Sequence, residues 1–229
     1  MPKLPMRQVH LDFHTSECID HIGSRFDKEN FKRCLKKGHI NSITLFAKCH
    51  HGWTYFPSET NEMHPGLHFD LLSAELEACA EAGVAAPIYI SAGFDEKYAV
   101  AHPEDLVIWE KGGHAPKVLE KDGHKYLENG YFNLICMNSP YLKILEAQTK
   151  EVVEKFHPVG VFFDIVAPRI CWCKRCNVEI AALGMDPDDL QSHKLHGEML
   201  YKRYCETVNA AVRSVDPDIR IFHNNGHIP

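Results

Sequence analysis

The sequence predicts an α/β protein of the (β/α)8 TIM-barrel type, in which the 229 residues supply the first five strand–helix units. Short apolar segments alternate along the chain with segments of helical periodicity, which is typical of a parallel sheet with right-handed crossovers. Polar side chains follow the C-terminal end of each apolar segment, where barrels assemble their active sites. No GxGxxG or GxxxxGK(S/T) motif follows any of these segments, which disfavours a nucleotide-binding doubly wound sheet.

Five segments have the length and composition of strands. The first alternates apolar and polar residues, and the other four are short runs rich in β-branched, aromatic and other apolar residues. We expect strands at Gln8–His14, Ser42–Cys49, Ala86–Ser91, Val159–Val166 and Ile219–His223.

Four further segments carry apolar residues at helical spacing. Gly38 and Gly83 lie just past the ends of the first two, and Ser139 and Pro140 suit the N-cap and first position of the third. We expect helices at Lys28–Lys37, Phe69–Ala82, Ser139–Phe156 and Leu190–Val215. The long segment before the third helix is rich in Gly, His and charge and has no predicted element.

The composition indicates a globular protein, with 45% hydrophobic and 24% charged residues. A net charge of −6 argues against a nucleic acid or an anionic membrane as partner, because both require clustered Lys and Arg. No apolar run approaches the roughly 18 residues of a membrane span. The first residues lack the apolar stretch of a signal peptide, so we expect a cytoplasmic protein.

Five units do not close a barrel. An open arc of five strands would expose apolar strand edges and helix faces, which proteins normally avoid. We therefore expect the sequence to be a fragment of a longer chain, and the alternative is that it closes by forming a homo-oligomer. A monomer that melts cooperatively would contradict both.

Several polar residues at the predicted strand ends are candidates for chemistry. Asp164 ends a buried apolar strand, a costly position for a carboxylate unless it faces water, a metal or a partner group. It can serve as a nucleophile or base, or it can cap the following loop. His50, His51 and Trp53 follow the second strand and suit a sugar, with imidazoles for the hydroxyls and an aromatic face for the C–H side. Alternatively, the histidines cap a loop and the indole packs in the core.

The first and fifth strands add further polar residues. His10, Asp12 and His14 share one face of the first strand, where they can bind substrate, bind a metal, or form a hydrogen-bonded layer in the barrel floor. The last role suits His10, the deepest of the three. We expect His14, together with His223 and Asn224 at the end of the fifth strand, to contact the substrate.

Three of the nine cysteines form one short cluster, Cys171, Cys173 and Cys176. The C-x-C-x-x-C spacing allows one loop to grip a tetrahedral Zn²⁺, which needs a fourth ligand from elsewhere. We expect Cys136 to be this fourth ligand, because it precedes the neighbouring strand–helix unit. The alternative is three reduced thiols without metal. The other cysteines are scattered and are expected to be buried small hydrophobes.

Several strings together resemble a known family. They are VHLDFHTS, FDKENF, NSITLFAKCHHGWTYFPS, HPGLHFDLL, PIYISAGFDE, ICMNSPY and GVFFDIV with its CxCxxC. Their combination is similar to the hypothetical glycosyl hydrolase family six, which is related to the α-L-fucosidase-like barrels. The resemblance implies that residues 1–229 are the N-terminal portion of a TIM-barrel glycoside hydrolase catalytic domain with a carbohydrate substrate.

The resemblance also implies roles for single residues. His50 and His51 match the paired histidines of the fucosidase AKHHDGF segment, which contacts the sugar, although Gly52 and Trp53 replace Asp-Gly-Phe and imply a different contact. Asp164 matches the nucleophile of the fucosidase WFD motif. The cysteine cluster resembles the zinc cluster of family 42 β-galactosidases, but the Glu acid/base of their preceding strand is absent. The cluster therefore supports zinc more than β-galactosidase activity.

The implied reaction is retaining hydrolysis of an O-glycosidic bond, with attack by Asp164 and protonation by a second carboxyl group. In fucosidase-like barrels that acid comes from later in the chain or from variable loops, and Asp95 and Glu96 are the local candidates. Two alternatives remain. One is a metal-dependent amidohydrolase-type barrel using His10, Asp12, His14 and His223, and the other is a non-catalytic carbohydrate-binding barrel fragment.

Overall fold

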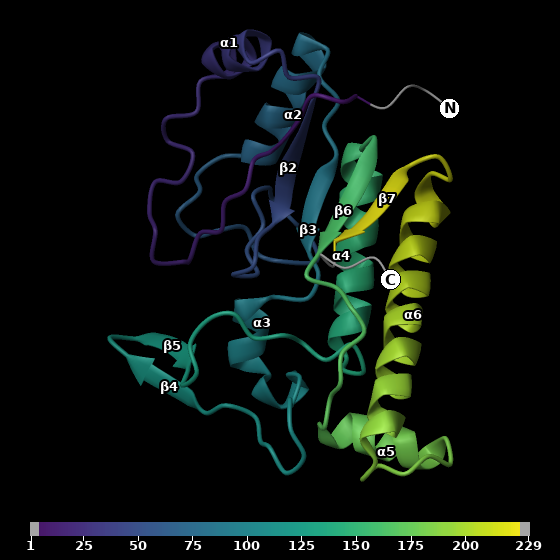
Figure 1. Cartoon of the computed structure of the whole chain (residues 1–229). Coiled ribbons are helices and arrows are strands. Elements are labelled where there is room, and N and C mark those ends of the chain that lie inside the picture. The colour runs from purple at the N-terminus through teal and green to yellow at the C-terminus, as the bar shows by residue number, and fades with distance from the viewer. Residues whose placement is uncertain (1–4, 225–229) are drawn as a thin grey trace.

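The computed structural model of the chain describes residues 5–224. A parallel sheet of five strands forms its centre, in the order β1 (Gln8–His10), β2 (Ser42–Lys48), β3 (Ile88–Ser91), β6 (Gly160–Asp164) and β7 (Arg220–Asn224). Each strand pairs in parallel with the next one of the series. The sheet curls into a half-barrel (Figure 1).

Long helices connect these strands and cover the outer face of the sheet. They are α1 (Lys28–Lys37), α2 (Leu71–Ala82), α4 (Tyr141–Phe156) and α6 (Leu190–Val215). Helix α1 contacts α2, and α4 contacts α6. Leu45, Ile90 and Phe163 of the sheet are fully buried against residues of these helices, such as Leu145 and Val208. Within residues 5–224, none of the helices is both long and apolar enough to cross a lipid bilayer.

Smaller elements occupy the segments after β3 and β6. They are α3 (Glu96–Ala101), a short 3-10 helix (Pro103–Asp105), a hairpin of β4 (Val118–Lys121) and β5 (His124–Leu127), and α5 (Lys174–Ala182). Figure 1 shows them gathered beyond the carboxyl ends of the strands, and no pattern in the sequence predicted them.

The predicted strands and helices are confirmed, with corrected ends. Strand β1 ends at His10, so Asp12 and His14 lie in the irregular segment that follows it. The predicted N-cap at Ser139 is wrong, because Pro140 occupies that position and α4 begins at Tyr141. Helix α2 begins after Asp70, whose side chain accepts a hydrogen bond from the Ser73 amide.

The inner face of the sheet is a row of aromatic rings. Phe46 and Tyr89 stack with their centroids 3.8 Å apart, Tyr89 and Phe162 lie 5.7 Å apart, and Phe162 and Phe222 lie 4.8 Å apart. His10 packs against Phe46, Tyr89 and Phe162, so it belongs to the floor of this face. Phe222, at the edge of the row, is 54% exposed.

Candidate active site

The carboxylate of Asp164 is held at the end of β6 by its two neighbouring strands. The Tyr89 hydroxyl donates to Oδ2 at 2.6 Å, and Asn224 Nδ2 donates to Oδ1 at 2.7 Å. Register explains the arrangement, since Asp164 lies opposite Ser91 of β3 and Asn224 of β7. Burial, followed by the bond to Asp164, raises the pKa of Tyr89, so its phenol stays a neutral donor. These two bonds compensate the burial of the carboxylate and set the direction of its oxygens.

His50 faces Asp164 from the end of β2. Its Nε2 lies 3.8 Å from Asp164 Oδ2, and its Nδ1 lies 2.7 Å from Ser91 Oγ. Because the Ser91 hydroxyl donates to the carbonyl of Phe94, it accepts from His50, which places the proton on Nδ1. Burial lowers the pKa of His50 to about 3, so the ring is neutral and Nε2 is an acceptor. Two acceptors therefore face each other across this gap, and a ligand that presents two O–H donors can satisfy both of them.

His14 stacks on His50 with the ring centroids 3.7 Å apart and an interplanar angle of 10°. Its Nδ1 accepts the backbone N–H of His50 at 3.1 Å, so its proton lies on Nε2, which is 2.9 Å from Asp12 Oδ1. Burial lowers the pKa of His14, against the opposing charge of Asp12. A pair of neutral, fixed imidazoles thus stands beside Asp164.

His51 and Trp53 have enclosed ring nitrogens that are free of partners. Within the described residues, neither His51 Nδ1 nor Trp53 Nε1 has a hydrogen bond. His51 packs against the ring of Phe132 at 5.0 Å, and the ammonium of Lys97 lies 4.8 Å from the centre of the Trp53 ring. One face of the indole is therefore already covered, which limits its predicted role as a sugar platform to the other face.

The His50–His51 segment is anchored to the N-terminal end of α3. The carbonyls of His50 and His51 accept the backbone N–H groups of Glu96 and Lys97 at 3.0 and 3.2 Å. Beneath them, Lys48 Nζ lies 3.0 Å from Asp95 Oδ2, and both side chains are 3% exposed. The register shift between Phe46 and Lys48 turns Lys48 to the outer face, where it also donates to Tyr141 and Gln148.

The two local candidates for the proton donor, Asp95 and Glu96, differ in their surroundings. Asp95 is bound to Lys48 and accepts the Tyr98 amide as the N-cap of α3. Both carboxyl oxygens of Glu96 are enclosed, and burial raises its pKa to about 7 against the opposing effect of Asn133. Asp95 is thus committed to Lys48, whereas the carboxyl group of Glu96 is enclosed without a hydrogen-bond partner.

His223, a predicted substrate contact, is turned away from the side of the sheet that carries the Asp164 carboxylate. His223 Nδ1 lies 3.0 Å from the Tyr204 hydroxyl and Nε2 lies 3.1 Å from Asn209 Oδ1, so both nitrogens face α6. Successive residues of a strand point to opposite faces, and Asn224 takes the inner one. The same placement separates His223 from His10, Asp12 and His14, so the four ligands of the amidohydrolase alternative do not converge.

Some residues of this cluster were missed by the sequence analysis. Tyr89 shares the inner face with Ser91 two residues later, and strand alternation could have identified it. Phe132 belongs to the long segment without predicted elements, yet its ring lies 5.2 Å from that of His50 and 6.3 Å from that of His14. No signal in the sequence places Phe132 there.

The four predicted cysteine ligands are brought together beside this cluster. The sulfurs of Cys136, Cys171, Cys173 and Cys176 are buried and lie within 4.8 Å of one another. Cys136 and Cys176 are 3.4 Å apart, too far for a disulfide and close to the sulfur separation in a tetrahedral thiolate site. Cys176 lies in α5 and Cys173 is the N-cap of that helix. The cysteines of the C-x-C-x-x-C motif therefore come from a loop and from the first turn of a helix, whereas a single loop was predicted.

Comparison with known proteins relates the chain to glycosidases. Residues 27–165 match the model of a family described as hypothetical glycosyl hydrolase 6. Among solved structures, an α-L-fucosidase isoenzyme 2 from Paenibacillus thiaminolyticus is 44% identical, with a TM-score of 0.89 over 98% of this chain and 33% of that one. The α-L-fucosidase AlfC from Lactobacillus casei, in complex with its α-L-fucose product, is 15% identical, with a TM-score of 0.50 over 86% of this chain and 50% of that one.

The chain thus spans a third of the first of these structures and half of the second. The second likeness concerns the fold alone. No curated protein sequence matches the chain.

Proposed function

Because this chain belongs to the hypothetical glycosyl hydrolase 6 family, we propose that its strand ends form a glycosidase site that cleaves O-glycosidic bonds. The observation that carries the proposal is the carboxylate of Asp164, held by Tyr89 and Asn224 and facing the acceptor nitrogen of His50. The likeness to an α-L-fucosidase at 44% identity makes an α-L-fucoside the first substrate to test.

In the proposed reaction, Asp164 Oδ attacks the anomeric carbon and forms a glycosyl-enzyme, while a carboxylic acid protonates the departing oxygen. Water then releases the sugar with retention of configuration, and in such enzymes the two carboxyl groups lie about 5–5.5 Å apart. Tyr89 and Asn224 aim the nucleophile, and His50 Nε2 accepts a sugar hydroxyl. His14 supports His50, and His51 and Trp53 border the sugar.

Asp164→Asn tests this assignment, because it keeps the shape and removes the nucleophile. In a full-length chain, we expect hydrolysis of 4-nitrophenyl α-L-fucoside to fall by about 10³-fold or more, with partial rescue by azide. Asp122→Asn, at the exposed turn between β4 and β5, is the matched control and should keep full activity. Retained activity of the Asp164 variant would rule out this nucleophile. A chelator distinguishes the amidohydrolase alternative, since it should abolish that activity but at most destabilise a glycosidase.

We also propose that Cys136, Cys171, Cys173 and Cys176 hold a structural Zn²⁺ ion. Four buried thiols without a disulfide fit this ion, which thiolates bind in a closed tetrahedral site. Such an ion would fasten the segment after β6 to the segment before α4 and take no part in the reaction. Metal analysis of the purified protein should find about one zinc per chain, and Cys176→Ser should lower this ratio.

We further propose that residues 1–229 are the N-terminal portion of a barrel catalytic domain. The match to a third of a longer fucosidase chain and the 54% exposed Phe222 on the inner face support this proposal. Light scattering should find self-association of the isolated chain through that face, which Phe222→Ser should reduce. A monomer that unfolds cooperatively would contradict the proposal.

A further inference from the structure

Glu17, Cys18 and His124 form a group of metal-ligating side chains outside the site at Asp164. A carboxylate oxygen, a sulfur and a ring nitrogen of the three residues all lie within 4.8 Å of one another. Glu17 and Cys18 belong to the segment after β1, and His124 begins β5 of the hairpin, 106 residues beyond Cys18. Figure 1 shows this segment and the hairpin on the same flank of the molecule. The fold therefore brings three different kinds of ligand atom to one point.

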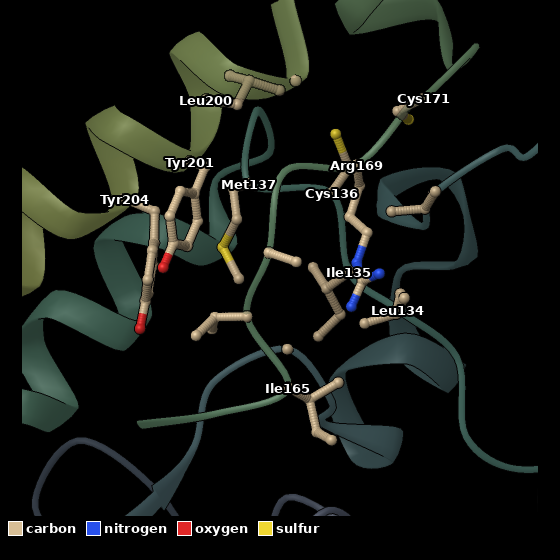
Figure 2. Close-up of a pocket in the computed structure, with 15 residues that line it drawn as sticks. Leu134, Ile135, Cys136, Met137, Ile165, Arg169, Cys171, Leu200, Tyr201 and Tyr204 are labelled. Atoms are coloured by element: carbon tan, nitrogen blue, oxygen red, sulfur yellow. The ribbon is translucent and has the colours of Figure 1, made fainter. Parts of the chain in front are cut away.

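This group is separate from the four-cysteine cluster. Cys136 and Cys171 of that cluster line a cavity together with Leu200 of α6, as Figure 2 shows. None of the three residues of the present group lines that cavity, because they come from the segment after β1 and from the hairpin. A metal ion held by them would therefore be a second ion, with its own ligands.

The separation of sulfur and nitrogen suits one metal ion between them. Cys18 Sγ lies 3.7 Å from His124 Nδ1. In a tetrahedral zinc site, bonds of about 2.3 Å to sulfur and about 2.0 Å to nitrogen place these two atoms roughly 3.5 Å apart. Thiolate, imidazole and carboxylate are also the ligands that Zn²⁺ takes in proteins, and three of them leave a fourth position open for water.

The charge of Glu17 favours a cation at this position. None of the ion pairs that lysines and arginines form within residues 5–224 involves Glu17. Burial, and then the charges of Asp95 and Glu17, raise the pKa of Glu96, so negative charge also acts on the neighbouring residues. A divalent cation would neutralise the Glu17 carboxylate and favour the thiolate form of Cys18 that a metal requires.

Other contacts fix both segments that carry the ligands. The Ser16 carbonyl accepts hydrogen bonds from His64 Nε2 at 2.9 Å and from the Ile19 backbone N–H at 3.0 Å, which closes a turn around residues 17 and 18. In the hairpin, the side chain of Leu127 is fully buried three residues after His124. Ligands on segments held in this way lose less conformational entropy when they bind an ion.

We infer that Glu17, Cys18 and His124 bind a second Zn²⁺ ion, which joins the hairpin to the segment after β1. The two connected segments also carry His14 and Phe132, whose rings both lie against that of His50. The ion would therefore hold together two segments that border the candidate active site. Its ligands are exposed or half-buried, so we expect weaker binding than at four buried thiolates, and filling only when zinc is added. Binding of the ion does not depend on the proposed glycosidase function.

Calorimetric titration of Zn²⁺ into the chain tests this inference, with the thiols reduced and the four-cysteine cluster already supplied with zinc. We expect the parent protein to take up about one further ion per chain. Cys18→Ser and His124→Gln should each weaken this binding by at least about 10-fold, because each removes a ligand. Cys34→Ser is the matched control, since it removes an exposed cysteine outside the group and should bind zinc like the parent protein.

Zinc uptake by exposed histidines elsewhere is the main competing result. Asp20, His21 and His68 form another exposed group, so loss of the added ion on His68→Gln rather than on Cys18→Ser would overturn the inference. It would also be overturned if the parent protein took up no further zinc, as expected when Cys18 is only hydrogen-bonded to His124. Uptake that survives both Cys18→Ser and His124→Gln would do the same.

Hydrogen exchange tests the joining of the two segments. Added zinc should slow the exchange of backbone amides in β4 and β5 of the parent protein, but not in Cys18→Ser. Unchanged exchange in the parent protein would overturn the proposed link between the hairpin and the segment after β1. Equal unfolding temperatures of the parent and the variants before zinc is added would show that lost binding does not result from unfolding.

Discussion

Gly52 supports the two histidines of the proposed site, and replacing it with alanine should be unusually costly. Its φ is +89°, and a Cβ there would lie 2.1 Å from Asp95 Oδ1 and 2.8 Å from Asp95 Cγ. The carboxylate cannot easily yield, because Oδ1 accepts the Tyr98 amide and Oδ2 bonds the buried Lys48. The methyl group must therefore displace either this ion pair or the His50–His51 segment.

The magnitude follows from two contributions. A non-glycine residue at positive φ costs about 1–2 kcal/mol. Breaking a buried ion pair costs about 3–5 kcal/mol, because the remaining charge keeps no partner. Lys48 and Asp95 are each 3% exposed, so water cannot compensate for the lost contact. We expect Gly52→Ala to lower the free energy of unfolding by about 4–7 kcal/mol.

Gly83→Ala is the matched control. Gly83 has a φ of +67°, and no atom lies within 4 Å of a Cβ built there. Alanine at this position therefore incurs only the cost of a positive φ and no steric clash. Urea unfolding of both variants should show about 1 kcal/mol lost at position 83 and several times more at position 52. In a background with Asp95→Ala, where the clashing atoms are absent, Gly52→Ala should cost about as much as Gly83→Ala. Equal losses at both glycines in the unsubstituted background would refute the reasoning.

Three further predictions concern pH, metal and the two faces of β7. Burial raises the pKa of Glu75 from 4.5 to about 8, so stability is lost as pH rises through that interval, by roughly 5 kcal/mol in total. Glu75→Gln should therefore become increasingly more stable than the parent protein between pH 5 and 8.5, and parallel curves of unfolding free energy against pH would contradict this. Removal of zinc by a strong chelator should lower the unfolding temperature of the parent protein but not that of Cys176→Ser, and equal shifts would speak against the metal site. Asn224→Ala should lower fucoside hydrolysis by about 10-fold or more, because Asp164 loses a hydrogen-bond donor. His223→Phe should instead lower stability with little effect on the rate. Calorimetry and kinetics of both variants check this, and the opposite assignment of the two effects would refute the orientation of β7.

The alternation of apolar strands and amphipathic helices was enough to predict the parallel sheet, because each pattern reflects which faces of a segment are buried. The positions at the carboxyl ends of those strands likewise predicted that Asp164, His50 and Asn224 lie close together, since parallel strands present their carboxyl ends on one side of the sheet. The spacing of Cys171, Cys173 and Cys176 indicated a shared site, because residues so close in sequence cannot lie far apart. These conclusions depend on local periodicity and on distance along the chain.

Tertiary contacts decided the rest. The 3.4 Å approach of Cys136 to Cys176 spans 40 residues, and the hydrogen bond from Tyr89 to Asp164 spans 75. Local patterns carry no information on such approaches, because they depend on strand register and on how the inserted segments after β3 and β6 fold back. The orientation of His223 toward α6 arises in the same way. A side chain's neighbours are set by the packing of elements, and that packing is a property of the whole chain.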